Sequence, residues 1–301
     1  MKILNLGSLN IDRVYSVPHF VQPKETISAV GYEEFCGGKG LNQSVALARA
    51  GALVYHAGAV GKDGEILVSM LESSGVSLDY LRKLDGASGH AVIQIDPSGQ
   101  NNIIICGGAN RKIDKDYIDE VISDFEEGDF LVLQNEISNV PYAMEAAKKK
   151  GMTVVFNPSP IDEGVFECDL SLVDYFVLNE VEGQALAGIQ SEEPEIIKAA
   201  LLEKFPDAIF MLTLGENGCY YFKKSLSSSR EIFEVDVVDT TGAGDTFLGY
   251  FIASVAAGDP VHITLKKASA ASAISIGKPG ASPSIPDLGE VTNFLLKYPG
   301  Y

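Results

Sequence analysis

Val238-Asp239-Thr240-Thr241-Gly242-Ala243-Gly244-Asp245-Thr246-Phe247 is the part of this 301-residue chain that says most about its architecture. The preceding residues 231–237 alternate apolar and polar side chains, which predicts a strand, and residues 247–257 repeat apolar side chains at helical spacing. The unpaired N–H groups and the dipole of a helix start attract anions, and glycines let the backbone approach a ligand closely. The stretch therefore predicts an anion-binding corner between a strand and a helix.

An acid, Asp245, stands at this positive corner. It either caps the helix or lies beside the bound anion and accepts a proton from an attacking hydroxyl group. Taken alone, a Gly-x-Gly-Asp sequence favours the cap. A second glycine-rich segment, Cys36-Gly37-Gly38-Lys39-Gly40-Leu41-Asn42-Gln43-Ser44, opens a helix predicted over residues 41–50. Taken alone, it is explained equally well by a flexible turn with a solvated lysine.

Together the two segments resemble the two signatures of the ribokinase-like (PfkB) carbohydrate kinases. Gly51 and Gly61 also stand where that family's pattern has glycines. The chain departs from the pattern in two places. Asp63 and Gly64 are adjacent where the family usually has two intervening residues, and Tyr250 stands where it has a small residue. We expect the first departure to alter a helix start and the second to alter packing behind the anion loop.

Composition narrows the class of protein. An apolar content of 46% supports one large domain over residues 1–301, and the net charge of −18 argues against nucleic acid or an anionic membrane as a partner. No apolar run reaches the roughly 18 residues of a membrane span, and residues 1–7 begin as a strand rather than as a signal peptide. The four cysteines lack metal-binding spacing, which favours free thiols in a reducing compartment. We therefore expect a cytoplasmic protein.

From residue 112 onward, strand and helix patterns alternate. This is typical of an α/β fold with a doubly wound, mostly parallel sheet flanked by helices. The first strand of the chain is expected at residues 2–9, and residues 225–229 predict a polar turn. Further strands are predicted at 130–134, 153–156, 175–178 and 208–213, and helices at 114–126, 140–150, 180–187, 193–205, 262–276 and 287–296.

Two groups of short strand patterns, over about residues 13–36 and 88–107, stand apart from this alternation. Prolines break the first group, whose strands are expected at 14–17 and 26–30, and a turn at 96–99 divides the second. The resemblance implies that both groups form a small β lid, which excludes water from phosphoryl transfer. It also implies a homodimer through this lid.

Polar residues follow the predicted strands. Asn10 and Asp12 come just past the first strand, at the edge where open parallel sheets bind ligands, although the residues alone favour an Asx turn. The resemblance instead assigns them to the sugar. The substrate-binding residues that it implies are Asn10, Asp12, Gly38, Lys39, Asn42 and Glu136. Because the whole set is present, the resemblance favours D-ribose as the substrate.

The resemblance also implies a nucleotide site with two cations. Asn179 and Glu182 match an N-x-x-E motif that organises Mg²⁺ through water near the phosphates of ATP, although without the family Glu182 is an ordinary acid of a first helical turn. The nucleotide-binding residues implied are Asn179, Thr213, Gly215, Gly218 and Gly244. A monovalent cation, expected to be K⁺, is implied at Asp239, Thr241, Ser275, Lys278, Gly280 and Ser284.

These residues together predict transfer of the γ-phosphoryl group of ATP to a primary hydroxyl of a sugar, with D-ribose giving D-ribose 5-phosphate. Asp245 is expected to be the base, with the N–H groups of Thr241, Gly242, Ala243 and Gly244 as the anion hole. Two alternatives stay open. Another substrate, such as fructose, deoxyribose, 2-keto-3-deoxygluconate or a nucleoside, requires only a few different side chains. A non-catalytic regulator that binds a sugar or a nucleotide could use the same fold.

Overall fold

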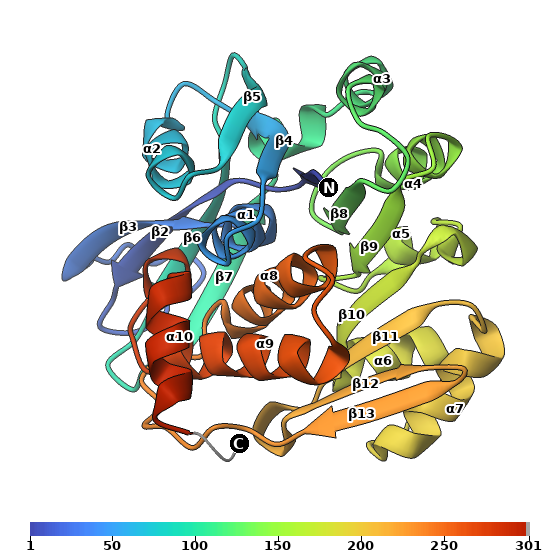
Figure 1. Ribbon diagram of the computed structural model, residues 1–301. Coiled ribbons are helices and arrows are strands. Elements are labelled where there is room, and N and C mark those ends of the chain that lie inside the picture. The colour runs from blue at the N-terminus through green and yellow to red at the C-terminus, as the bar shows by residue number, and fades with distance from the viewer. Residues whose placement is uncertain (299–301) are drawn as a thin grey trace.

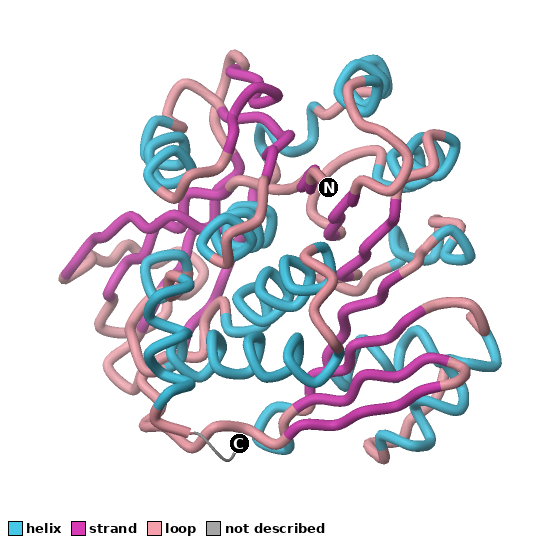
Figure 2. The backbone as a smooth tube through the Cα atoms, in the orientation of Figure 1, coloured by secondary structure: helices cyan, strands magenta, loops and turns pink. Residues whose placement is uncertain are grey.

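Short apolar strands build the central sheet of the computed structural model, which describes residues 1–298 (Figures 1 and 2). Within that range the sheet has nine strands in the order β13-β12-β11-β10-β9-β8-β1-β4-β5. The strands from β11 to β5 run parallel, and β12 and β13 are antiparallel at one edge. Their bounds are β1 (Ile3–Leu6), β4 (Val54–Val60), β5 (Ser77–Lys83), β8 (Phe130–Gln134), β9 (Thr153–Asn157), β10 (Tyr175–Asn179), β11 (Ile209–Thr213), β12 (Cys219–Lys223) and β13 (Leu226–Arg230).

Helices cover both faces of this sheet, because alternate residues of its strands point to opposite sides. In β8, Phe130 and Val132 belong to one hydrophobic core, and Leu131 and Leu133 belong to the other. The first core is closed by α1 (Lys39–Arg49), α2 (Glu65–Ser73), α8 (Ala243–Ala256), α9 (Val261–Ile276) and α10 (Leu288–Leu296). The second is closed by α3 (Lys115–Ser123), α4 (Val140–Lys149), α5 (Glu163–Phe166), α6 (Glu180–Ala187) and α7 (Pro194–Lys204). Short 3₁₀ helices are η1 (Gly108–Lys112), η2 (Leu170–Leu172), η3 (Gly215–Asn217) and η4 (Ser282–Ser284).

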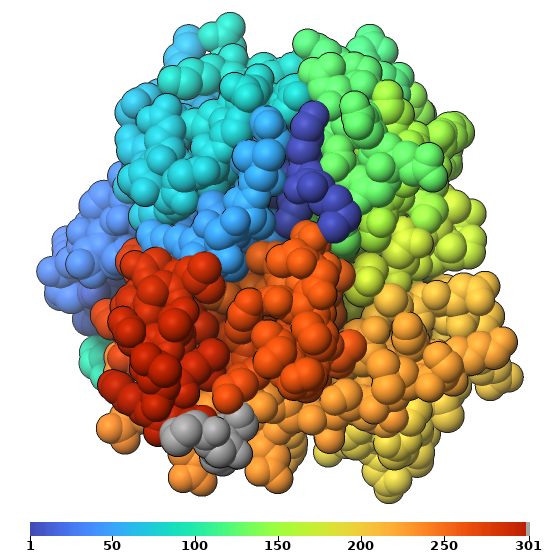
Figure 3. Space-filling model, viewed as in Figure 1, coloured from blue at the N-terminus to red at the C-terminus, as the bar shows by residue number. Residues whose placement is uncertain are grey.

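The strand order reverses at β1, which lies between β4 and β8. The chain winds from β1 to one edge through β4 and β5, and later from β8 toward the other edge. In Figure 3 the C-terminal part of the chain, coloured orange to red, occupies the lower part of the face shown. In such sheets the carboxyl ends of the strands beside the reversal form a ligand-binding crevice. The predicted doubly wound, mostly parallel α/β fold is confirmed.

A separate four-stranded sheet, at the left of Figure 1, has the order β3-β2-β6-β7. Its strands are β2 (Asn10–Ser16), β3 (Gly31–Gly37), β6 (Gly89–Ile95) and β7 (Asn101–Cys106). Asp63 joins this sheet to the body of the protein, because its carboxylate accepts hydrogen bonds from Ser88 N at 2.7 Å and from Arg13 Nη2 at 3.0 Å. The neighbouring Gly64 is the N-cap of α2, which has no side-chain cap.

Three of the predicted local structures are wrong. The strand expected at residues 26–30 does not form, since β3 begins only at Gly31, opposite Ser16 of β2. Residues 231–237 form no strand either. Phe233 is buried against the Phe294 ring, whose centroid lies 5.2 Å away, so the alternation reflects an extended segment packed on α10. The serine-rich residues expected as a turn instead form the edge strand β13.

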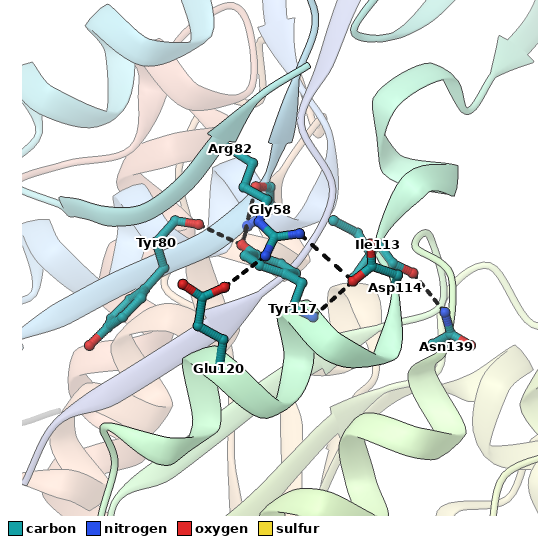
Figure 4. Close-up of polar contacts among 8 residues, drawn as sticks. All are labelled: Gly58, Tyr80, Arg82, Ile113, Asp114, Tyr117, Glu120 and Asn139. Atoms are coloured by element: carbon teal, nitrogen blue, oxygen red, sulfur yellow. Dashed lines mark hydrogen bonds and ion pairs between the residues drawn. The ribbon is translucent and has the colours of Figure 1, made fainter. Parts of the chain in front are cut away.

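The hydroxyl group of Tyr117 on α3 contacts both β4 and β5, next to an irregularity in the pairing of these strands (Figure 4). Tyr117 Oη accepts a hydrogen bond from Gly58 N at 2.7 Å and donates to the Tyr80 carbonyl oxygen at 2.5 Å. Arg82 lies over the Tyr117 ring, with its guanidinium carbon 4.1 Å from the ring centroid, and pairs with Glu120 at 2.8 Å. The buried side chain of Tyr117 thus joins α3 to both β4 and β5.

Candidate active site

The loop before α8 is held in shape by Asp239. Its Oδ1 atom accepts hydrogen bonds from Thr241 N at 2.9 Å and Thr241 Oγ1 at 2.6 Å, and its Oδ2 atom accepts one from Gly280 N at 2.8 Å. Burial alone would raise the pKa of Asp239, but these donors outweigh it and lower the pKa. Gly242 has a φ angle of 75° and lies against Ala281, so this turn favours glycine.

The loop offers free N–H groups at the start of a 14-residue helix. Thr241 N and Ala243 N are used within the loop, the latter on the Thr240 carbonyl oxygen at 3.2 Å. Among the described residues, the amides of Gly242, Gly244 and Asp245 have no hydrogen-bond acceptor. These three amides, at the positive end of the helix dipole, are free to bind an anion. Of the four donors that the sequence predicted, those of Gly242 and Gly244 are free, and the amide of Asp245 was not predicted.

Asp245 does not cap its helix, since no side chain caps α8. Only 7% of its surface is exposed, and both carboxylate oxygens accept hydrogen bonds from α1. Asn42 Nδ2 donates to Oδ2 at 3.0 Å, and Gln43 Nε2 donates to Oδ1 at 2.8 Å. The two helices approach closely at Gly249, where a Cβ atom would overlap Ala46. The geometry therefore favours the second role of Asp245, a carboxylate beside the anion.

The residues assigned to the sugar gather around Glu136, which follows β8. Glu136 Oε2 accepts hydrogen bonds from Lys39 N at 3.0 Å and from Ser8 Oγ. Asn10 and Asp12 lie in β2 of the small sheet rather than in a turn, and Asn10 Oδ1 accepts from Asn110 Nδ2 at 2.8 Å. Burial raises the pKa of Asp12 to about 6, and the negative charge of Glu136 adds to the effect.

Lys39 stands at the centre of the acidic groups. Burial would lower the pKa of its amine, but the charges of Asp245, Glu136 and Glu182 together raise it. These three acids belong to the expected base, the sugar site and the magnesium site respectively. The structure thus brings together side chains that the sequence assigns to three different tasks. Gly38, directly before Lys39, forms the N-cap of α1 with a φ angle of 91°.

The residues assigned to the nucleotide follow the neighbouring strands. Asn179 and Glu182 form a capping box at the start of α6, with Asn179 Oδ1 accepting from Glu182 N at 2.8 Å and Glu182 Oε2 accepting from Asn179 N at 3.0 Å. Thr213 Oγ1 donates to the Leu178 carbonyl oxygen at 3.2 Å. Gly215 and Gly218 bound η3, with φ angles of 52° and 86°.

The residues assigned to a monovalent cation lie beside the anion loop. Ser275 Oγ and Ser284 Oγ are 3.0 Å apart, and Ser284 Oγ also donates to the Ala281 carbonyl oxygen at 2.8 Å. The side chain of Lys278 pairs with Glu290 at 2.7 Å, so its backbone carbonyl is the group that it could offer to a cation. Residues 275–284 therefore offer hydroxyl and carbonyl oxygens, the ligands that an alkali cation prefers.

Sequence reasoning missed the polar side chains behind the carboxylate. Gln43, Gln134 and Asn157 are linked in a row, with Gln134 Nε2 donating to Gln43 Oε1 at 2.7 Å and Gln43 Nε2 donating to Asn157 Oδ1 at 3.2 Å. Ser8 was missed as well, although it orients Glu136. The sequence signal that could have identified such a residue is a polar side chain at the end of a buried strand, such as Gln134 in β8.

Tyr250, the departure from the family pattern, lies behind the anion loop on α8. Its ring is buried, and its hydroxyl donates to the Pro286 carbonyl oxygen at 2.9 Å. Burial raises the pKa of this phenol, so it stays neutral. Tyr250 therefore fastens α8 to the segment before α10, as expected for a change in packing.

A buried carboxylate beside free helix-start amides, at the carboxyl edge of a doubly wound sheet, is an arrangement that a phosphotransferase can use. The chain matches the family model described as pfkB family carbohydrate kinase over residues 1–288. It is 35% identical over 298 residues to a ribokinase from Haemophilus influenzae, with 96% of this chain and 97% of that enzyme covered. The chain belongs to the pfkB family of carbohydrate kinases.

Two further relatives bear on the substrate. A deoxyribokinase from Salmonella typhi is 32% identical over 306 residues, with 98% of this chain and 99% of that enzyme covered. A solved structure of Arabidopsis thaliana ribokinase, complexed with ribose and ATP, matches with a TM-score of 0.87 at 31% identity and covers 98% of each chain. The predicted class of enzyme, an ATP-dependent sugar kinase, is confirmed.

Proposed function

We propose that this protein phosphorylates D-ribose at its primary hydroxyl with ATP, giving D-ribose 5-phosphate and ADP. The observation that carries the proposal is the position of Asp245, which is held by two amides of α1 beside the unpaired amides of Gly242 and Gly244. A carboxylate so placed can serve an attacking hydroxyl group and the anion that it attacks. The ribokinases at 30–35% identity over nearly the whole chain support ribose as the sugar.

In the proposed reaction Asp245 accepts the proton of the sugar hydroxyl group, and the oxygen of that hydroxyl group forms a bond to the γ-phosphorus of ATP. The bond from that phosphorus to the bridging oxygen breaks, and ADP leaves. The amides of Gly242, Gly244 and Asp245 stabilise negative charge on the transferring group. Asp12, Lys39 and Glu136 hold the sugar, so the reacting atoms meet in one orientation.

The proposed cations are Mg²⁺ and K⁺. Within residues 1–298 no three His, Cys, Asp or Glu side chains are close enough to hold a metal ion. Mg²⁺ keeps most of its water and binds phosphates, so buried Glu182 is its proposed contact through water. Bound Mg²⁺ would neutralise charge on the phosphates. The oxygens of residues 239–241 and 275–284 would hold K⁺ and order the anion loop.

We also propose a homodimer through the small sheet, which serves as the lid. Its edge strand β7 exposes Ile103, Ile104 and Ile105 to 51%, 66% and 64%, an apolar strip that a second copy of the chain could cover. A cytoplasmic location is proposed as well, supported by four free thiols. None of the helices within residues 1–298 is long and apolar enough to span a bilayer.

Another substrate remains the second candidate, since the Salmonella typhi deoxyribokinase is nearly as similar as the ribokinases. The deciding experiment measures ADP release by the purified protein with Mg-ATP and K⁺ over ribose, deoxyribose, fructose, 2-keto-3-deoxygluconate and nucleosides. Selective turnover of ribose is the expected result. Selective turnover of another compound would overturn the assignment of ribose, and binding without turnover would favour a regulator.

A further inference from the structure

Gln43 is fully buried and stands outside the set of residues assigned to sugar, nucleotide or cation. Its Nε2 atom lies 2.8 Å from Asp245 Oδ1, although the two residues are 202 positions apart in the chain. We propose that Gln43 is a positioning residue for Asp245, and that a row of side-chain amides through Gln134 and Asn5 fixes the direction of its donor. The proposal rests on the proposed function, in which Asp245 is the base.

The row is anchored at one end by a backbone carbonyl. Asn5 Nδ2 donates to the Gly40 carbonyl oxygen at 2.8 Å and to Ser44 Oγ at 2.8 Å. A carbonyl oxygen can only accept a hydrogen bond, so the NH₂ group of Asn5 must face it and Asn5 Oδ1 must face the other way. There Asn5 Oδ1 accepts from Gln134 Nε2 at 2.9 Å.

The same NH₂ group of Gln134 determines the orientation of Gln43. Gln134 Nε2 donates its second hydrogen to Gln43 Oε1 at 2.7 Å. The oxygen of Gln43 is therefore occupied, and its NH₂ group must point to the opposite side, where Asp245 Oδ1 lies. Gln134 thus acts on the base without touching it.

A second backbone carbonyl fixes the row from the other side. Asn157 Nδ2 donates to the Val177 carbonyl oxygen at 3.0 Å, so Asn157 Oδ1 faces Gln43 Nε2 at 3.2 Å. A flipped Gln43 would set its oxygen against Asn157 Oδ1 and Asp245 Oδ1, while its NH₂ group faced the NH₂ group of Gln134. In a buried site, such unmatched groups are costly because water cannot satisfy them. One orientation of Gln43 remains.

The consequence for the reaction is a carboxylate that cannot rotate. Asn42 holds one oxygen of Asp245 and Gln43 holds the other, and each oxygen keeps a lone pair for a proton. Proton transfer in phosphoryl transfer depends on that orientation, because a small misplacement of a catalytic group lowers the rate strongly. Loss of Gln43 should therefore lower kcat more than it changes the KM for either substrate.

The test compares Gln43→Leu, Gln134→Met and the double variant with the natural enzyme, using kcat and the KM values for sugar and ATP. Gln43→Leu should lower kcat by about 10- to 100-fold, with KM changed less than about threefold. Gln134→Met should lower kcat less, by about 3- to 10-fold, since Gln43 remains but can flip. The double variant should be no slower than Gln43→Leu, because Gln134 acts only through Gln43.

A pH profile separates positioning from a merely structural role. Gln43→Glu places a second carboxyl group against Asp245, so the acidic limb of the kcat profile should move to higher pH. Gln43→Leu removes one donor to the carboxylate but adds no charge, so it should move that limb in the same direction by less than Gln43→Glu does. Tyr117→Phe is the matched control, because it removes buried hydrogen bonds that involve none of the residues of the row, and it should lower thermal stability while leaving kcat unchanged.

Three results would overturn the proposal: kcat within about twofold of the natural enzyme for Gln43→Leu, an additive double variant, or an unmoved acidic limb for Gln43→Glu. If Gln43→Leu does not fold, Gln134→Met and Gln43→Glu still decide the matter. Asp245→Asn separates this proposal from the proposed function. An active Asp245→Asn would refute the assigned base, whereas an inactive Asp245→Asn with an active Gln43→Leu would refute only the positioning role.

Discussion

Tyr117 and Asp245 are both buried polar side chains, 2% and 7% exposed, yet the clusters around them differ. In the Tyr117 cluster of Figure 4, no buried side-chain nitrogen or oxygen of the labelled residues lacks a hydrogen-bond partner. In the Asp245 cluster, Asn42 Oδ1 and Gln134 Oε1 have none. A complete cluster stabilises the fold, whereas an incomplete one keeps polar atoms available to a ligand or a moving proton.

The largest effect is expected from a substitution of Asp245, at the centre of the incomplete cluster. Asp245→Asn should lower kcat by roughly 10³-fold, because an amide cannot accept the proton of the sugar hydroxyl. The free energy of unfolding should also fall, by about 1–3 kcal/mol, because the NH₂ group of the new amide faces one of the two donors that the carboxylate accepts from. Steady-state kinetics and the melting temperature of the same preparation measure both effects. A variant with near-normal turnover and normal binding of both substrates would refute the assigned base.

The complete cluster should respond in stability alone. Tyr117→Phe leaves Gly58 N and the Tyr80 carbonyl oxygen unpaired inside the protein. The free energy of unfolding should fall by about 1–3 kcal/mol, and kcat should stay unchanged. Denaturant unfolding of both proteins gives the first quantity. A loss of turnover without a loss of stability would mean that the two clusters are not separate in function.

A pH titration sharpens the contrast at the sugar site. Burial raises the pKa of Asp12 to about 6, with Glu136 adding to the effect, so the ionised fraction falls as pH drops below 6. The ionised carboxylate is the form that accepts sugar hydroxyl groups. The KM for the sugar should then rise about tenfold per pH unit below pH 6. In Asp12→Asn, this rise should be absent although KM is higher throughout, and an unchanged profile would exclude Asp12 as its source.

The raised pKa of Asp12 affects protein stability in the opposite direction to sugar binding. Asp12 holds its proton more tightly in the folded protein, where its pKa is about 6, than at the ordinary value of 3.8. Its contribution to stability is therefore fully present below pH 3.8 and is lost as pH rises through 6. Asp12→Asn should be more stable than the natural protein at pH 7, and the difference should shrink as pH falls. Thermal melts at pH 5 and pH 7 check the direction.

The smallest expected effect lies behind the anion loop. Tyr250→Phe removes the hydrogen bond to the Pro286 carbonyl oxygen and should cost about 1 kcal/mol of unfolding free energy. Turnover should remain within about twofold, since the ring still fills its buried site. A large loss of turnover would show that Tyr250 shapes the anion loop itself. Melting temperature and kcat of this single variant are sufficient to decide.

Much of the fold could be predicted because the central strands are short apolar runs bounded by turn residues. Residues 130–134 were predicted to the residue, as were the bounds of α6 at 180–187. The edge strand β13 could not be predicted, since its serines carry no apolar alternation and its pairing with β12 supplies the order. Residues 231–237 show the reverse case, in which an apolar–polar alternation occurs without a neighbouring strand, with Phe233 buried but Val237 61% exposed.

The glycine signatures located the anion loop and Asp245, but not the groups that orient the carboxylate. The hydrogen bond from Gln43 depends on how closely α1 approaches α8, which Gly249 and Ala46 permit. No local pattern encodes a contact across 202 residues. The unpaired amides of the loop likewise became clear only when Asp239 was seen to occupy Thr241 N.

Asn10 and Asp12 belong to β2, a strand of the small lid sheet, whereas Glu136 and Asp245 belong to the body. In the proposed function, the ligands for one sugar thus come from two parts of the molecule. Any shift in the population of lid positions is therefore also a shift in sugar affinity, and the apparent Kd equals the intrinsic Kd divided by the fraction of molecules with the lid in place. By reciprocity, the sugar itself favours that lid position before ATP is consumed.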